Sequence, residues 1–157
     1  IFLKVLVLVL FIKVFPSYAN LNGKGLVCIC IECSSTDDNI IGYHFERVSK
    51  KNLNIFPYRF KNVQDNITIE KGGGFLFSTN NDAITWSLIG TNGIGSNNLN
   101  RKNLILKSYY KQSKNIAGRT IIRKCEVFSN KSFFDRMKKI RNEKQLLHNK
   151  YLQKNKI

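Results

Sequence analysis

Apolar and polar residues alternate along most of the chain from residue 24 to residue 128, and this period of two is typical of β-strands with one buried face. Turn-forming residues interrupt the alternation at intervals of roughly eight to twelve residues, as in an antiparallel sandwich or small barrel. The chain is therefore expected to be mostly β. The pattern predicts strands over residues 25–32, 41–48, 54–60, 66–71, 75–78, 83–89, 99–110 and 120–128.

Within these strands the alternation assigns side chains to faces. Tyr43 and Phe45 lie on one face of their predicted strand, and His44 and Glu46 lie on the other. Trp86 falls on an apolar face and is interpreted as a core residue. The strand that contains Pro57 is expected at a sheet edge, because proline has no backbone donor.

Beyond residue 128 the apolar positions recur at helical spacing over a basic background. Ser132 and Asp135 resemble a capping box and predict the start of a helix. In one interpretation this helix lies on an anionic membrane or a partner. In the other, Phe133, Met137 and Ile140 pack on the sheet while the rest frays into water. We expect a β-domain over residues 20–130 and an amphipathic basic helix and tail over residues 131–157.

Residues 1–19 have the three parts of a secretory signal peptide: a positive start at Lys4, an apolar stretch, and small residues up to Ala19. Cleavage is predicted after Ala19, and the protein is expected to be secreted or periplasmic. A transmembrane helix needs about 20 apolar residues, whereas Lys13 and Pro16 interrupt this stretch. An uncleaved anchor and a lipid attached at the first cysteine are the alternatives.

Composition adds a strong positive charge, since 26 Lys and Arg residues oppose 10 Asp and Glu residues and leave a formal charge of +16. Such a charge favours a polyanionic partner. It is also what an AT-rich genome produces, because Asn and Lys each occur 19 times and Arg only 7 times. Arginine is preferred where phosphates are bound through two hydrogen bonds, so the excess of lysine argues against a specific nucleic-acid site.

One segment combines basic and aromatic residues and is the candidate surface for an anionic envelope polymer or a membrane surface. Proteins in that location meet glycans and anionic lipids more often than DNA. The candidate binding residues are Arg101, Lys102, Lys107, Tyr109, Tyr110, Lys111, Arg119, Arg123 and Lys124.

The four cysteines are expected to form two disulfides in an exported protein. Cys28 and Cys30 stand two positions apart on one predicted strand, where their side chains do not converge, and this leaves two pairings. We favour Cys28 with Cys125 and Cys30 with Cys33. The first would join the opening strand to the closing one, and the second would close a tight turn.

No catalytic residue, metal site or cofactor is predicted. Cys30 and Cys33 have the spacing of a redox pair, but no helix follows to lower a thiol pKa. Three cysteines crowd one end of the chain and Cys125 stands alone, which disfavours structural zinc. His44 and Glu46 are interpreted as a surface pair rather than a catalytic dyad.

The chain resembles small exported β-rich proteins of AT-rich bacteria. The resemblance rests on the N-terminal segment, on Cys125 with the charged tail, and on the stretches Gly25-Leu26-Val27-Cys28, Tyr43-His44-Phe45, Ile84-Thr85-Trp86 and Leu99-Asn100-Arg101-Lys102-Asn103-Leu104. It implies a periplasmic or secreted location and no catalytic residues. The general layout is also similar to small periplasmic β-barrel inhibitors of lysozyme, although no inhibitory motif can be carried over.

The expected function is therefore a non-catalytic binding or interaction protein that recognises an anionic envelope component. Two alternatives remain. One is a small exported enzyme whose site is assembled from scattered residues, and the other is a structural protein of the envelope.

Overall fold

The computed structural model describes residues 21–33, 39–90, 93–112 and 117–155. The predicted signal segment, residues 1–19, and its cleavage position after Ala19 lie outside the described residues. The elements are β1 (Lys24–Glu32), β2 (Ile40–Arg47), β3 (Leu53–Val63), β4 (Asn66–Lys71), β5 (Phe77–Thr79), β6 (Ala83–Gly90), β7 (Gly93–Asn100), β8 (Ile105–Lys111), β9 (Arg119–Ser129) and α1 (Asn130–Lys154).

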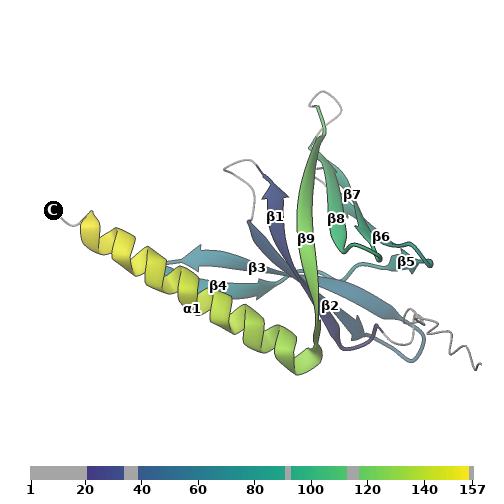
Figure 1. The fold of residues 1–157 in the computed structure, drawn as a ribbon, viewed down its shortest axis with the longest axis horizontal. Helices are drawn as coiled ribbons and strands as arrows, with labels where there is room; N and C mark the ends of the chain where they lie inside the picture. Colours follow the sequence, from purple (N-terminus) through teal and green to yellow (C-terminus); the bar gives the residue numbers. More distant parts are fainter. Residues whose placement is uncertain (1–20, 34–38, 91–92, 113–116, 156–157) are drawn as a thin grey trace, which may run out of the picture.

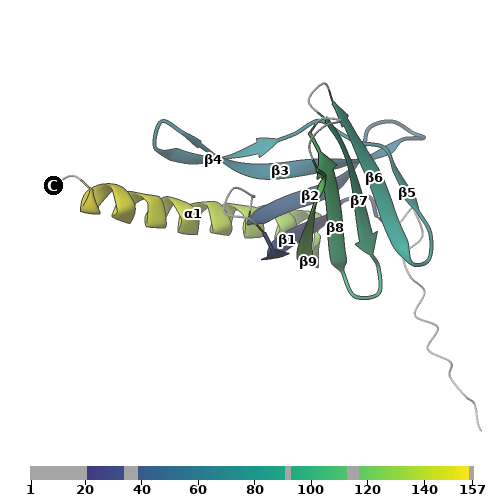
Figure 2. The same cartoon turned by 90° about the horizontal axis from the view of Figure 1, so that it is seen from above.

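All of these strands belong to one antiparallel sheet in the order β4-β3-β2-β1-β9-β8-β7-β6-β5. The sheet curls strongly, so that β5 and β6 stand across from β2 and β3 (Figures 1 and 2). Phe75, just before β5, exchanges two backbone hydrogen bonds of 2.9 Å with Ile55 of β3. The chain between β4 and β5 thus passes from one edge region of the sheet to the other. The expectation of a mostly β, antiparallel domain is confirmed.

The concave face of the sheet holds the larger core. Its centre is formed by Leu26, Phe45, Ile55, Leu99 and Leu106, each at most 3% exposed. Trp86 belongs to this core as expected, and its ring meets that of Tyr43 edge to face at 5.1 Å. The alternation in the strands directs one side chain of every two toward this interior.

The first half of α1 covers the convex face over β1 and β2, and the helix continues along β4 (Figure 1). Phe133, Met137 and Ile140 are buried against the sheet, so the packing interpretation of the helix start is confirmed. The expected fraying of the rest is wrong, because α1 continues as a regular helix to Lys154, with Leu147 and Tyr151 exposed. The start predicted at Ser132 is wrong, because the N-cap residue is Ser129 and its side chain bonds that of Ser132 at 2.9 Å rather than a backbone amide.

The strand predicted over residues 99–110 is wrong. A turn divides it into the end of β7 and the start of β8, and the Asn100 side chain stabilises that turn by accepting hydrogen bonds from the amides of Lys102 and Asn103. Leu104 then adopts a positive φ of 56°, which sets the direction of β8. The first part of β7 was not predicted, since its Gly and Asn residues have low β-propensity.

Pro57 does not mark an edge strand, because β3 pairs with both β2 and β4. The Pro57 carbonyl accepts a hydrogen bond from the amide of Gly72, one residue beyond the end of β4. In another residue the amide N–H at this position would point to the same side as the carbonyl. Because β4 ends there, the proline removes only one hydrogen bond, at the end of the pairing between β3 and β4.

Two disulfides join Cys28 to Cys125 and Cys30 to Cys33, as favoured from the sequence. Cys28 and Cys125 stand directly opposite each other on β1 and β9 with their Cα atoms 4.0 Å apart. The first and last strands of the chain are thereby linked in the middle of the sheet. In the part of the chain that the structure describes, no helix has the length and apolar character needed to cross a membrane.

Candidate ligand-binding pocket

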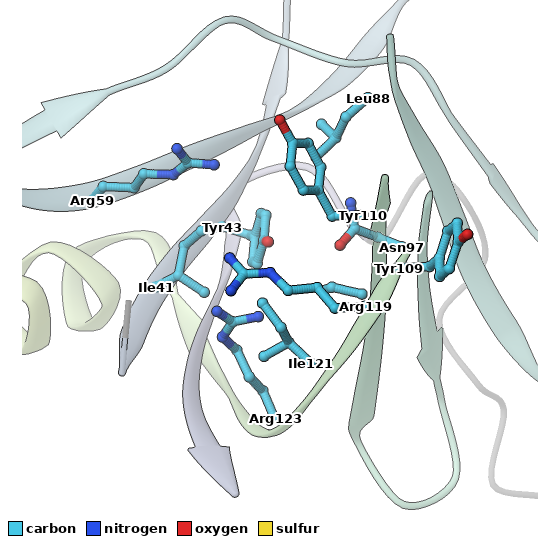
Figure 3. Close-up of a pocket in the computed structure, with 11 residues that line it drawn as sticks. Ile41, Tyr43, Arg59, Leu88, Asn97, Tyr109, Tyr110, Arg119, Ile121 and Arg123 are labelled. Carbon is cyan, nitrogen blue, oxygen red and sulfur yellow. The ribbon is translucent and has the colours of Figure 1, made fainter. Parts of the chain in front are cut away.

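A pocket of about 310 Å³ lies on the concave face at one end of the curled sheet (Figure 3). We call it the arginine pocket. Side chains from β2, β3, β6, β7, β8 and β9 contribute to its walls, so it depends on the curl of the sheet. Its lining residues are Ile41, Tyr43, Arg59, Leu88, Asn97, Ser108, Tyr109, Tyr110, Arg119, Ile121 and Arg123.

Gly95 explains why there is space at this end. Pairing across the sheet places Arg119, Tyr110, Gly95 and Leu88 in one row on the concave face. A Cβ atom at Gly95 would lie 3.1 Å from the backbone carbonyl oxygen of Tyr109 and 3.5 Å from the side chains of both Tyr110 and Leu88. The missing side chain therefore leaves a hollow between these two residues.

Three arginines line the arginine pocket. Arg119 and Arg123 extend from β9 toward Ile41 and Tyr43 on β2, and Arg59 extends from β3 (Figure 3). Arg123 is only 5% exposed, which is unusual for a charged side chain. A guanidinium group donates in a fixed fork that matches carboxylate and phosphate oxygens, so this wall is suited to an anion.

The floor of the arginine pocket carries two further polar groups. Asn97 of β7 and Ser108 of β8 are direct cross-strand partners, and Asn97 is 2% exposed. Asn97 Nδ2 and Ser108 Oγ are buried and have no hydrogen-bond partner among the described residues. A buried polar group without a partner costs about 1–3 kcal/mol, so a polar ligand atom at the floor would be stabilising.

The nine residues predicted to bind a polyanion do not form one surface. The arginine pocket brings together Tyr110, Arg119 and Arg123, whose side chains face the concave side. Tyr109 also borders the pocket, but it is 42% exposed and its ring is turned away from the arginines (Figure 3). The other five predicted residues lie elsewhere.

Lys107, Lys111 and Lys124 occupy the alternate, convex side of β8 and β9, and the Lys124 ammonium donates to the carbonyl of Asn103. Arg101 and Lys102 lie in the turn between β7 and β8, at the opposite end of the sheet. There Arg101 donates to the Asn80 carbonyl and Lys102 pairs with Asp82 at 2.7 Å. These two residues join neighbouring turns and do not line the arginine pocket.

Sequence reasoning missed Arg59, Asn97 and Ser108. Arg59 follows an aromatic-rich stretch. The face of the strand on which it lies could be predicted only by continuing the alternation of side chains through Pro57. Asn97 lies in β7, which was not predicted as a strand. Ser108 was within the predicted segment, and its place between Leu106 and Tyr110 on the same face was the available signal.

A second polar cluster lies on the convex face beside α1. Glu46 Oε1 accepts a hydrogen bond of 2.7 Å from Tyr58 and lies 3.1 Å from His44 Nδ1, while Glu46 Oε2 pairs with Lys71. His44 is 4% exposed and stacks on Phe133 at 5.1 Å. The cluster connects β2, β3 and β4 under the helix. The expectation of a surface pair is therefore wrong for His44, because Phe133 of α1 covers its ring.

Acid should weaken the fold through Glu46. Burial raises the pKa of Glu46, but hydrogen bonds from Lys71, Tyr58 and His44 outweigh that effect and hold the pKa below its usual value. A lowered pKa means that the carboxylate stabilises the fold above the pKa of the unfolded chain, and that this contribution is lost as the pH falls through the folded pKa. We expect E46Q to melt at a lower temperature than the wild type at pH 7.

The difference in melting temperature between E46Q and the wild type should disappear as the pH is lowered from 5 to 3. Thermal melts recorded at several pH values measure it. E70Q provides the control, because Glu70 is exposed and its Oε2 lies 3.8 Å from Lys61. A constant gap between E46Q and the wild type over this range would contradict the role given to the charge.

Among the described residues, no group of three or more His, Cys, Asp or Glu side chains is placed to hold a metal ion. The arginine pocket, which is lined by three arginines and two buried polar groups without hydrogen-bond partners among the described residues, is the candidate functional site. No family model, no curated protein and no solved structure matches the chain.

Proposed function

We propose that this protein is a non-catalytic exported binding protein whose arginine pocket receives the anionic group of an envelope component. The observation that carries the proposal is the convergence of Arg59, Arg119 and Arg123 on a hollow floored by Asn97 and Ser108. Guanidinium, amide and hydroxyl groups are the donors that bind carboxylate or phosphate oxygens.

Composition supports a specific role for these arginines. The chain contains only seven arginines against 19 lysines, yet three of the seven line this one pocket. Codon bias toward lysine raises the overall charge but does not concentrate arginine. The remaining walls are apolar or aromatic, with Tyr43, Tyr110 and Leu88 available to contact an apolar part of the ligand.

The lining of the arginine pocket supports binding rather than catalysis, and the disulfides support export rather than a reducing compartment. The lining residues of the arginine pocket include no His, Cys, Asp or Glu, so in the described part of the chain Ser108 has no evident base beside it. The two disulfides agree with an oxidising location, as does the predicted signal segment.

Removal of one pocket cation should weaken anion binding. Phenyl phosphate is a suitable probe because it joins a dianion to a small ring, and phenol is its neutral counterpart. We expect R119Q to weaken phenyl phosphate binding about tenfold in isothermal titration calorimetry, since hydrogen bonds to a charged group contribute about 1.5–3 kcal/mol. Arg119 is exposed at the pocket mouth, so the substitution should leave the fold intact.

The matched control is K107Q, which removes the same charge from the convex side of the adjacent strand. Equal losses in R119Q and K107Q would show that only the general field of the protein attracts the anion. A second variant, G95L, fills the hollow without changing charge and should abolish binding. Retention of full affinity in G95L would place the site outside the arginine pocket.

A further inference from the structure

The concave face has a second cavity at the end of the sheet opposite the arginine pocket. We call it the apolar pocket. Its volume is about 270 Å³. Along β9 the inward-facing residues run from Arg119 and Arg123 through the buried Cys125 to Val127, which borders this cavity. The apolar pocket is lined by Leu21, Lys24, Leu26, Phe45, Ile84, Leu99, Arg101, Leu104 and Val127.

The chemistry of the apolar pocket differs from that of the arginine pocket. Its floor consists of Leu26, Phe45, Ile84 and Leu99, which are at most 3% exposed. Val127 faces the same interior but is 51% exposed. Apolar surface of this kind gains about 25 cal/mol for each Å² that a ligand covers, so an aliphatic group would bind favourably here.

The only charged groups among the described lining residues are cations, Lys24 and Arg101. Lys24 is exposed at the start of β1. The Arg101 guanidinium is held in place because its Nη1 donates a hydrogen bond to the Asn80 carbonyl. The same nitrogen lies 3.4 Å from Thr79 Oγ1. Asp82, in the neighbouring turn, is paired with Lys102, which is outside the lining. An apolar chamber bordered by two positive groups, of which Arg101 is held by hydrogen bonds, is complementary to a chain with an anionic end.

We propose that the apolar pocket binds a single-chain anionic amphiphile, with its aliphatic tail against Val127 and Leu26 and its anionic headgroup near Lys24 and Arg101. This site is separate from the arginine pocket, because the buried Cys125 and Leu106 lie between the two cavities on β9 and β8. The inference therefore does not depend on the proposed function of the arginine pocket.

The test uses decanoate as the probe, titrated calorimetrically into the protein below the concentration at which decanoate aggregates. We expect saturable binding whose affinity R119Q leaves unchanged, which distinguishes the apolar pocket from a carboxylate held in the arginine pocket. Decyltrimethylammonium, which has the same tail and the opposite charge, should bind at least fivefold more weakly. K24E should weaken decanoate binding about fivefold, in line with an exposed ion pair of up to about 1 kcal/mol.

V127W should abolish decanoate binding, because the larger ring fills the mouth of the apolar pocket at a position that is already half exposed. T120W, on the convex side of the same strand, is the matched control and should bind decanoate normally. Phenyl phosphate binding and melting temperature, both unchanged in V127W, would show that the variant is folded.

Three results would overturn the inference. The first is the absence of decanoate binding to the wild-type protein. The second is decanoate binding that survives V127W and is lost in G95L, which would place the amphiphile in the arginine pocket. The third is tighter binding of decyltrimethylammonium than of decanoate, which would contradict the role of Lys24 and Arg101.

Discussion

Replacement of Cys28 and Cys125 together by alanine is expected to lower the free energy of unfolding by about 5 kcal/mol. The bond joins residues 97 positions apart, and in the chain-entropy account a cross-link that closes so long a loop removes much of the freedom of the unfolded chain. Both side chains are also fully buried in the concave core, so their loss removes packing as well. Urea denaturation monitored by the fluorescence of Trp86 measures the effect.

The pair C30A with C33A is the internal control. That bond spans only three positions, and the same entropy account gives about 1.5 kcal/mol for so short a loop. Similar losses from removing either disulfide would show that loop length does not explain the stabilisation. Loss of phenyl phosphate binding in the Cys28 and Cys125 double variant would further show that this disulfide holds β9 in position.

F133A should destabilise the protein by about 3–5 kcal/mol, the second large effect. Phe133 is completely buried between α1 and the sheet, and truncation of a buried aromatic residue leaves a cavity that the surroundings fill only in part. The site is shaped for this ring: a Cβ atom at Gly25 would overlap it, and one at Gly42 would lie 2.9 Å from its Cζ. His44 and Tyr58 also contact the ring, at 5.1 and 5.4 Å between centroids.

F134A is the matched control, since Phe134 is the adjacent aromatic residue and is 41% exposed. We expect it to cost less than half as much in the same urea titration. If the two variants lost equal stability, the packing of Phe133 over the two glycines would not be what attaches the helix. Phenyl phosphate binding should be unchanged in F134A, because α1 and the arginine pocket lie on opposite faces of the sheet.

The accuracy of the sequence predictions followed the strength of the local signal. Period-two alternation located seven of the nine strands to within a few residues, and cysteine spacing with strand order selected the pairing of Cys28 with Cys125 that the structure contains. The region of residues 93–104 failed, because Gly and Asn residues carry little β-propensity and a positive φ at Leu104 has no sequence signature. The helix was predicted because its buried residues recur at the helical period, but its cap was not.

The candidate site was predictable only in part for a related reason. Tyr110, Arg119 and Arg123 were singled out by charge and aromatic character. Arg59 comes from a strand distant in the chain, and Asn97 from a part of β7 that has no strand pattern. Their meeting depends on the register of β6 to β9 and on the gap left by Gly95.

The sequence by itself determined the β character of the domain and the basic C-terminal helix, because each depends on a periodicity. It also favoured the pairing of the cysteines, because strand geometry keeps Cys28 from bonding to Cys30 and leaves two pairings. Only the tertiary structure decided that the basic segment divides between two faces and that three of the seven arginines converge. Alternation sends neighbouring residues to opposite sides of a strand, and the curl of the sheet then determines which distant residues share an enclosed space.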